Sequence, residues 1–257
     1  RMADAGWDVT AALAEPVTAD IHEPLPEPLH PAYLQAARTA AESALPPEVL
    51  YGAGLSIFTA LDLAAQTTSE TLLVEKVDYL KKIIGRRDEP LEVAGVLIRP
   101  QTGNLVAVYG GTQLTATDFS RATQARRQPG SSFKPLVYAL AFSQLSAEGM
   151  PIWRANSTVK NNRRVFPNTD GWNPRNISGD YSSTTTLAQG MAWSQNIAAA
   201  SLLEDLGGPR PLIEFATRMG YETSHFPEEM GLSLGQGEVT PLEQARFVAT
   251  IINGRLS

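Results

Sequence analysis

The chain has 257 residues, of which 43% are hydrophobic, and a formal net charge of −6, so it is long and apolar enough to bury a substantial core. Its acidic balance and the lack of clustered Lys and Arg argue against a nucleic-acid-binding surface. The absence of cysteine excludes disulfides, thiolate metal sites and a cysteine nucleophile, and three scattered histidines in predicted solvated loops argue against a histidine triad or zinc site: His22, His30 and His225.

The N-terminal part is predicted to be a linker that leads into a folded domain. Residues 1–8 have the pattern of the tail of a helix, and the sequence contains no signal peptide and no apolar run of about 20 residues. The segment Glu15–Pro31 is rich in proline and acidic residues and is expected to be stiff and extended. An alanine-rich amphipathic helix is predicted over Pro31–Ala44, with Pro46 and Pro47 ending it. The abrupt start indicates a fragment of a longer protein.

A strand and a long helix are predicted next. Gly54–Asp62 reads as a strand that runs into a helix start, with Asp62 as the N-cap residue. The helix over Leu63–Ile84 should pack by its apolar stripe. Its lysines are then expected on a solvated face: Lys76, Lys81 and Lys82.

Two short apolar runs then predict a β-hairpin. Val93–Ile98 and Leu105–Tyr109 are largely β-branched, and Arg99–Asn104 between them contains the Pro and Gly of a tight turn. Because both runs are continuously apolar, we expect the strand pair to be covered on both faces. No Gly-x-Gly-x-x-Gly motif is present, so a mixed α/β sandwich is favoured over a Rossmann fold.

A candidate nucleophile lies near the middle of the chain, in Gly130–Pro135. On a helix, residues three apart share a face with Cβ atoms about 5–6 Å apart, so the Ser131 hydroxyl and the Lys134 ammonium can meet. Pro135 is tolerated best in the opening turn of a helix, which places Ser131 at a helix N-terminus. There, free N–H groups and a positive partial charge would stabilise an oxyanion on an acylated serine. Taken alone, Ser-x-x-Lys is also a common polar helix face.

Proton transfer by Lys134 needs a neutral amine. A charged lysine is a poor base, so burial or the neighbouring cations Arg126 and Arg127 must lower its pKa. Its place before Pro135 is a mild conflict, because the residue preceding a proline is disfavoured in α geometry. The apolar period over Pro135–Leu145 predicts that the helix carrying the nucleophile is buried.

The segment Trp153–Asp180 has little periodicity and many turn formers, and it is predicted to form a rim of the substrate site. Trp172 and Tyr181 either shape a peptide-binding cleft there or serve for packing. The sequence leaves both alternatives open.

Two helices, Thr186–Trp193 and Ile197–Leu206, are predicted to meet at Ser194-Gln195-Asn196. At such a junction the serine hydroxyl can relay a proton between Lys134 and a leaving amine. The asparagine amide can hydrogen-bond both Lys134 and a substrate backbone. Taken alone, Ser-x-Asn also fits a helix cap.

The segment Leu232–Glu243 is predicted to be a loop that enters a helix over Leu242–Ile252. Thr240 is expected as N-cap, Pro241 as the first helical residue, and Glu243 as the second half of a capping box. We therefore expect this segment to have a structural role and to position the helix.

Several of these segments resemble class A penicillin-binding proteins, the bifunctional peptidoglycan synthases. The run Arg121–Pro135 is similar, almost letter for letter, to their active-serine segment, and Ser194-Gln195-Asn196 is similar to their Ser-x-Asn motif at the expected spacing. The resemblance covers nearly the whole chain and is strongest over Leu91–Glu243. It also includes shorter matches at Gly54–Asp62, Trp172–Asn176 and Leu232–Glu243.

The resemblance implies an α/β (α+β) fold of the penicillin-binding, serine-transpeptidase type, with a central antiparallel sheet flanked by helices. Residues 1–17 would be the tail of a glycosyltransferase domain, 18–90 a linker region and 91–257 a partial transpeptidase domain. The third motif of the family, Lys-Thr-Gly, does not occur before Ser257. We therefore expect a fold that is incomplete at its C-terminus and weak acylation, with the missing part of the domain in a longer form or in a second chain.

The implied function is peptidoglycan D,D-transpeptidation through an acyl-serine intermediate that β-lactams also form, with no metal or organic cofactor. The resemblance assigns catalytic roles to four residues: Ser131, Lys134, Ser194 and Asn196. It assigns substrate binding to four more: Gly130, Ser132, Gln195 and Trp172.

The implied partners are stem peptides, glycan strands derived from lipid II, β-lactams, and a lipoprotein activator or divisome and elongasome proteins. The implied location is the extracytoplasmic, periplasmic side of a bacterial inner membrane, with the anchor and the glycosyltransferase glutamates outside this chain. Two alternatives remain open. A serine β-lactamase lacks support because no clear deacylating glutamate motif follows the second motif. A non-catalytic penicillin-sensor or scaffold domain gains some support from the absent Lys-Thr-Gly motif.

Overall fold

The computed structural model describes residues 29–85, 90–111 and 119–254. The predictions for residues 1–17, for most of the proline-rich linker and for His22 lie outside these residues. In chain order the helices and strands are α2 (Pro31–Ala44), α3 (Pro47–Gly52), α4 (Leu63–Ile83), β1 (Gly95–Arg99), β2 (Asn104–Tyr109), the 3₁₀ helix η2 (Gly130–Phe133), α5 (Lys134–Phe142), β3 (Thr158–Lys160), β4 (Thr184–Thr186), α6 (Leu187–Ala192), α7 (Asn196–Asp205), α8 (Pro209–Arg218), the 3₁₀ helix η3 (Met230–Leu234) and α9 (Pro241–Asn253).

The N-terminal helices follow the sequence closely, but the strand predicted between them is wrong. Helix α2 has the predicted bounds, and α4 begins after Asp62, whose carboxylate accepts from Ala65 N at 3.0 Å as the expected N-cap. Gly54–Asp62 contains no strand. Instead, Pro47 opens the short helix α3, because proline fits the first turn of a helix as well as it ends the preceding one.

Helix α4 is attached to strand β2 mainly through one polar side chain, Gln66, and less through an apolar stripe. Of its side chains, Gln66 and Val77 are buried, whereas much of the expected stripe is exposed. The Gln66 amide donates to Val108 O at 2.7 Å and accepts from Val108 N at 2.8 Å. This pair of bonds occupies the outer edge of β2, where backbone groups would otherwise be free. The solvated lysine face is consistent with the exposure of Lys76 and Lys82.

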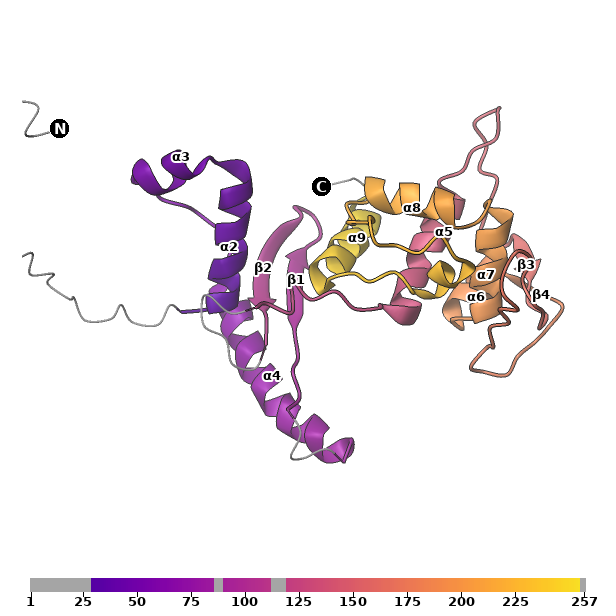
Figure 1. Ribbon diagram of the computed structural model, residues 1–257, viewed down its shortest axis with the longest axis horizontal. Coiled ribbons are helices and arrows are strands. Elements are labelled where there is room, and N and C mark those ends of the chain that lie inside the picture. Colours follow the sequence, from indigo (N-terminus) through magenta and orange to yellow (C-terminus); the bar gives the residue numbers. More distant parts are fainter. Residues whose placement is uncertain (1–28, 86–89, 112–118, 255–257) are drawn as a thin grey trace, which may run out of the picture.

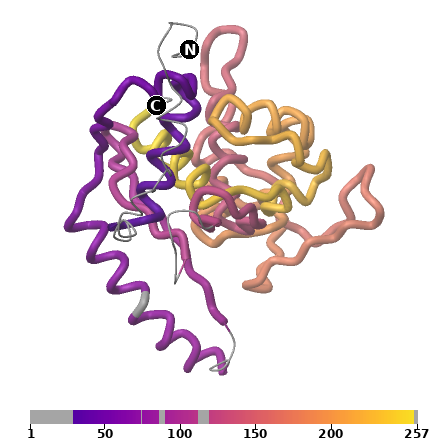
Figure 2. Tube along the Cα trace, turned by 60° about the vertical axis from the view of Figure 1, so that its left-hand side comes forward, coloured from indigo at the N-terminus to yellow at the C-terminus, as the bar shows by residue number. Residues whose placement is uncertain are grey.

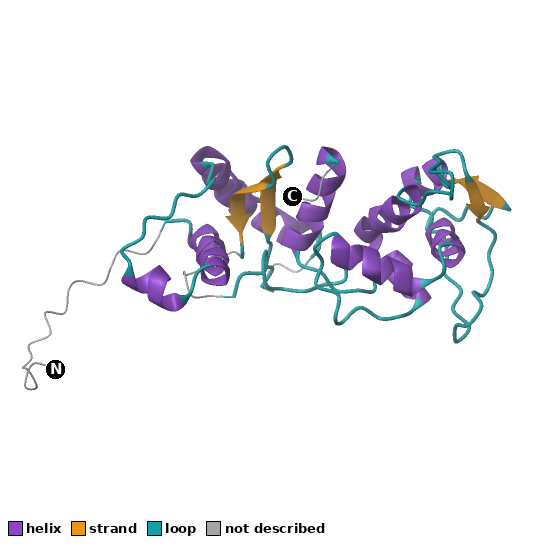
Figure 3. Ribbon diagram, turned by 90° about the horizontal axis from the view of Figure 1, so that it is seen from above, coloured by secondary structure: helices purple, strands orange, loops and turns teal. Residues whose placement is uncertain are grey.

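The predicted β-hairpin is confirmed. Strands β1 and β2 pair antiparallel, with a register shift between Leu97 and Ile98. In Figure 1 the hairpin lies between the α2–α4 side of the molecule and α9, and Figure 3 shows the same order from above. Residues 106–109 of β2 are buried, but Leu97 of β1 is 44% exposed, so the expected cover on both faces holds for β2 and not for β1.

The core lies around α5, the helix that follows the candidate nucleophile. Helices α7 and α8 and the 3₁₀ helix η3 pack against it, and Figure 2 shows these segments gathered in one lobe beside the hairpin. The predicted burial of this helix is confirmed for Leu136, Val137 and Ala141, which are fully enclosed, but the helix ends at Phe142 and Leu145 is 58% exposed. Burying such side chains stabilises the fold by about 1.5–3 kcal/mol for each large aliphatic residue. The nucleophile therefore sits on a rigid support.

The α/β class with antiparallel strands is confirmed, but the strands form two small sheets in the described ranges. Strand β3 pairs with β4 antiparallel in a second two-stranded sheet. Strand β3 lies within Trp153–Asp180, which was predicted to be irregular, so that prediction is wrong at Thr158–Lys160.

Three further observations concern the part of the chain that the structure describes. No helix in it has both the length and the apolarity needed to cross a bilayer. No group of three or more His, Asp or Glu side chains in it is arranged to hold a metal ion. The prediction of a solvated His30 is wrong, because its side chain is 13% exposed and its Nδ1 lies 2.8 Å from Glu70.

Candidate active site

The candidate nucleophile lies in a 3₁₀ turn directly before α5. Gly130 begins this turn with φ 57°, a conformation that glycine adopts without steric cost. Pro135 occupies the first turn of α5, as predicted, and Lys134 is in α geometry despite preceding it. The Ser131 residue is exposed, at the N-terminal end of a buried helix. The arrangement leaves its hydroxyl accessible while its support is fixed.

Lys134 is enclosed, and its amine points at the predicted second motif. The residue is 1% exposed. Its Nζ donates to Ser194 O at 2.5 Å, to Ser194 Oγ at 2.9 Å and to Asn196 Oδ1 at 2.7 Å. An ammonium has three N–H donors, so these acceptors use all of them. The structure thus brings Lys134 into contact with Ser194 and Asn196, which lie 60 and 62 residues further along the chain.

Burial is the cause of the altered charge state of Lys134. It lowers the pKa of the ammonium to about 8, since a charged group loses its hydration in the interior. The alternative cause, the neighbouring arginines, is not supported. Arg126 is paired with Glu243, with Nη1 to Oε2 at 3.2 Å. At pH 7 about a tenth of Lys134 is therefore neutral. The bonds of its Nζ named above go to Ser194 and Asn196, and proton transfer from Ser131 to the neutral amine stays a prediction.

The lowered pKa of Lys134 predicts a pH profile for acylation of Ser131. The neutral amine is the active form, so the acylation rate should rise about tenfold per pH unit below pH 8 and level off above it. Stopped-flow acylation by a fluorescent β-lactam between about pH 6 and 10 measures this. A flat profile, or a midpoint near the ordinary lysine value of 10.5, would contradict the role of Lys134 as base.

The predicted Ser-x-Asn motif lies at the junction of α6 and α7, as expected. Ser194 has φ 50°, a left-handed conformation that costs a non-glycine residue about 1–2 kcal/mol. This conformation directs both its carbonyl and its hydroxyl to Lys134. The orientation of Asn196 is fixed because its Nδ2 donates to Arg175 O at 2.7 Å, which leaves Oδ1 for Lys134. The second hydrogen on Nδ2 is not used by either of these bonds.

A buried amide network supports this junction from behind. Asn176 Oδ1 accepts from Ile197 N at 3.0 Å, and its Nδ2 donates to Asp180 O and to Asn161 Oδ1. Gln195 is 3% exposed and donates to Asp180 Oδ2 at 2.8 Å. Gln195, predicted to bind substrate, therefore lies inside this network and not on an open face.

The other predicted substrate-binding residues fall in two places. Gly130 and Ser132 lie in the nucleophile turn, where Ser132 Oγ donates to Pro129 O at 2.8 Å. Trp172 lies away from this turn and packs on Phe166, with ring centroids 5.2 Å apart. The same Trp172 lines a cavity of about 820 Å³ between the loop around residue 168, the start of α8 and η3. Of the two alternatives for Trp172, the structure favours packing.

A segment that was expected to be merely structural contacts the nucleophile turn directly. A Cβ on Gly235 would lie 2.4 Å from Gly130 O, so the two backbones touch. Gln244 Nε2 donates to Ser132 O at 2.6 Å, and Arg127 and Val239 exchange two backbone bonds of 3.0 Å. The predicted capping box at Thr240 is confirmed. No local sequence signal pointed to the contacts with the turn.

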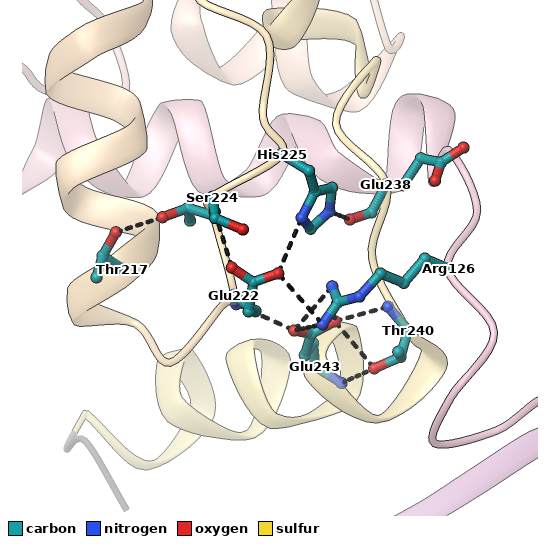
Figure 4. Close-up of polar contacts among 9 residues, drawn as sticks. Arg126, Thr217, Glu222, Ser224, His225, Glu238, Thr240 and Glu243 are labelled. Carbon is teal, nitrogen blue, oxygen red and sulfur yellow. Dashed lines mark hydrogen bonds and ion pairs between the residues drawn. The ribbon is translucent and has the colours of Figure 1, made fainter.

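A cluster of charged side chains connects the end of the Leu232–Glu243 segment to Arg126, which precedes Ser131 in the chain (Figure 4). Arg126 binds both oxygens of Glu243 at 3.2–3.3 Å, and Glu243 completes the capping box of α9. Glu222 lies beside this pair. Its carboxylate is 3.7 Å from Arg126 and also contacts Ser224 and His225, and its backbone N donates to Glu243 Oε1 at 3.0 Å. His225 Nε2 lies 2.7 Å from Glu238 O. Because the Arg126–Glu243 pair is only partly exposed, it fixes geometry more firmly than a surface pair would.

The sequence profile of the penicillin binding protein transpeptidase domain matches residues 93–257, more than half of the chain. The chain belongs to this family. It is 36% identical over 172 residues to penicillin-binding protein 1A of Neisseria meningitidis, a match that covers 65% of this chain and 20% of that protein. It is 30% identical over 226 residues to penicillin-binding protein 1B of Escherichia coli, covering 87% of this chain and 26% of the relative.

The same family appears among solved structures. The PonA1 protein of Mycobacterium tuberculosis in complex with penicillin V superposes with a TM-score of 0.69 at 25% identity, over 88% of this chain and 59% of that chain. Penicillin-binding protein 1A of Haemophilus influenzae superposes with a TM-score of 0.54 at 30% identity, over 62% of this chain and 23% of that chain. This transpeptidase chain spans only a fifth to about a quarter of the length of the curated relatives above. The resemblance to class A penicillin-binding proteins and the implied fold class are confirmed.

Proposed function

We propose that this chain forms the acylating part of a peptidoglycan D,D-transpeptidase within a bifunctional cell-wall synthase. One observation carries the proposal: a buried lysine with a pKa lowered to about 8 follows an exposed serine by one helical turn. The partners of that lysine, Ser194 and Asn196, are the residues that the second family motif supplies. This set of groups fits an activated serine nucleophile.

The first half of the reaction forms an ester on Ser131. Neutral Lys134 takes the hydroxyl proton as Ser131 Oγ attacks the penultimate D-Ala carbonyl of a stem peptide. As expected from the sequence, backbone N–H groups at the N-terminus of the nucleophile turn would stabilise the oxyanion that develops. The C–N bond then breaks, and the proton on Lys134 passes through Ser194 Oγ, 2.9 Å away, to the departing terminal D-Ala.

The second half transfers the acyl group to an amine on a neighbouring strand. The amine attacks the ester and loses a proton to Lys134, and Ser131 recovers a proton as its C–O bond breaks. Asn196 keeps Lys134 in place through Oδ1 in both halves. Asn196 Nδ2 donates one of its two hydrogens to Arg175 O, so the other can bind the substrate backbone, as expected from the sequence. β-Lactams would form the same ester and remain bound.

The wider setting of this chemistry is also a proposal. Family membership supports stem peptides and glycan strands as substrates, β-lactams as ligands, and a catalytic domain on the extracytoplasmic side of a bacterial membrane. The lipoprotein activator and the divisome or elongasome partners rest on the class A resemblance alone. The division of the chain at residues 17 and 90 stays a prediction.

Peptide transfer by the full-length protein tests the proposed function. A donor peptide ending in D-Ala-D-Ala is incubated with an amine acceptor, and the products are separated by liquid chromatography and mass spectrometry. We expect cross-linked peptide and free D-Ala in equal amounts, and no product from the Ser131→Ala variant. Repeated turnover of penicillin without cross-linking would favour a serine β-lactamase. Neither transfer nor a covalent penicillin adduct would favour a sensor or scaffold domain.

A further inference from the structure

The nucleophile turn lacks one of the bonds that normally stiffen a helix start. Pro135 has no N–H, so the α-helical bond to the carbonyl of Ser131 cannot form. Lys134 N donates to Ser131 O instead, in a 3₁₀ bond of poorer geometry. Gly130, with φ 57°, adds backbone freedom directly before the serine. The direction of the Ser131 hydroxyl must therefore be fixed by contacts from outside the turn.

One side chain supplies such a contact to the peptide group between Ser132 and Phe133, one residue beyond Ser131. Gln244 Nε2, on α9, donates to Ser132 O at 2.6 Å. Gln244 Oε1 accepts from Tyr221 OH at 2.9 Å. A carbonyl oxygen only accepts and the phenol has a proton to donate, so both ends of the amide have a defined orientation.

Tyr221, the hydrogen-bond donor to Gln244, is held firmly by its surroundings. Tyr221 is 4% exposed. Its ring meets Phe133 of the nucleophile turn edge-on at 6.0 Å and Phe247 of α9 at 5.8 Å. Gln244 is thus held between a buried phenol and the turn, and it lines the open groove beside Ser132.

We propose that Gln244 is a positioning residue that fixes the peptide group between Ser132 and Phe133 and, through it, the direction of the Ser131 hydroxyl. The inference rests on the proposed function, because it assigns Gln244 an effect on acylation. A misplacement of a reacting group by about 1 Å can reduce a rate by about a hundredfold. Loss of the donor should therefore slow the acylation step without weakening β-lactam binding.

The test uses Gln244→Glu in the full-length protein. This variant keeps an acceptor for Tyr221 OH and loses the donor to Ser132 O. Gln244→Leu removes the donor without adding a charge, which separates donor loss from repulsion. The matched control is Gln189→Glu on α6, the same change at an exposed glutamine whose side chain makes no hydrogen bond to the described residues.

Two measurements are made on each variant. The first is the acylation rate constant and the dissociation constant for a fluorescent penicillin. We expect both Gln244 variants to lose about tenfold to a hundredfold in the rate constant, with the dissociation constant within about threefold of wild type. The second is amide hydrogen exchange over residues 129–136, which should become faster in both variants and stay unchanged in Gln189→Glu.

The outcomes separate the inference from the proposed function. An unchanged rate constant with a lower melting temperature would overturn the inference and leave Gln244 a structural residue. Unchanged hydrogen exchange over the turn would overturn it as well. A wild-type protein that is never acylated would contradict the proposed function, and the exchange measurement would still decide whether Gln244 holds the turn.

Discussion

Lys134→Met should reduce the rate of β-lactam acylation by about a thousandfold, since general-base catalysis contributes about 10²–10⁴ to a rate. Methionine fills similar volume but cannot accept the Ser131 proton. The residual rate should no longer change with pH around 8, because the group that titrates there is gone, so the loss should be largest above pH 8. Acylation is followed by the increase in fluorescence anisotropy of a labelled penicillin.

The control for this substitution is Lys82→Met, which removes an exposed lysine of α4. It should leave acylation unchanged. Lys134→Met also leaves three acceptors without their donor, at Ser194 and Asn196, so the melting temperature is measured alongside. A folded Lys134→Met protein that acylates within about threefold of wild type would show that another group takes the proton.

Gly235→Ala should disrupt the nucleophile turn from the opposite side. The new Cβ would lie 2.4 Å from Gly130 O and 2.7 Å from Gly130 N, distances at which one backbone must move. Overpacking of this kind costs about 1–3 kcal/mol. We expect a lower free energy of unfolding and a large loss of acylation together, because the displaced residue directly precedes Ser131. Chemical denaturation and penicillin labelling measure the two effects.

Gly220→Ala is the matched control for Gly235→Ala. Gly220 has φ 85° and Gly235 has φ 81°, so both variants carry the same left-handed strain of about 1–2 kcal/mol. No atom lies within 4 Å of a Cβ at Gly220. The difference between the variants therefore isolates the contact with Gly130. Equal losses of stability and equal acylation in the two variants would mean that this contact does not position the serine.

Local patterns predicted those elements whose stabilising contacts are close in sequence. The capping box joins Thr240 to Glu243, and the hairpin turn joins β1 to β2 over a few residues. The match of Arg121–Pro135 to a family segment likewise placed Ser131 and Lys134 on one helix start, and the second motif brought Ser194 and Asn196 to the same lysine.

The errors concern contacts that the sequence does not encode locally. Gly54–Asp62 has a strand-like pattern but forms no strand in the structure, and Phe58 is 95% exposed. Strand β3 has three residues, too short to show a period. His30 was expected in solvent because its partner, Glu70, lies forty residues away in the chain. The bond between Gln244 and Ser132 spans 112 residues, so no window of sequence could reveal it.

The central claim is that Ser131 is the residue that becomes acylated, with Lys134 as its base. The most direct measurement is the intact mass of the full-length protein after incubation with penicillin, followed by fragmentation of the labelled peptide. We predict one adduct, located on Ser131 and not on Ser132, that is lost in Ser131→Ala and retained in Ser43→Ala. An adduct that persists in Ser131→Ala, or a folded wild-type protein with no adduct, would contradict the account.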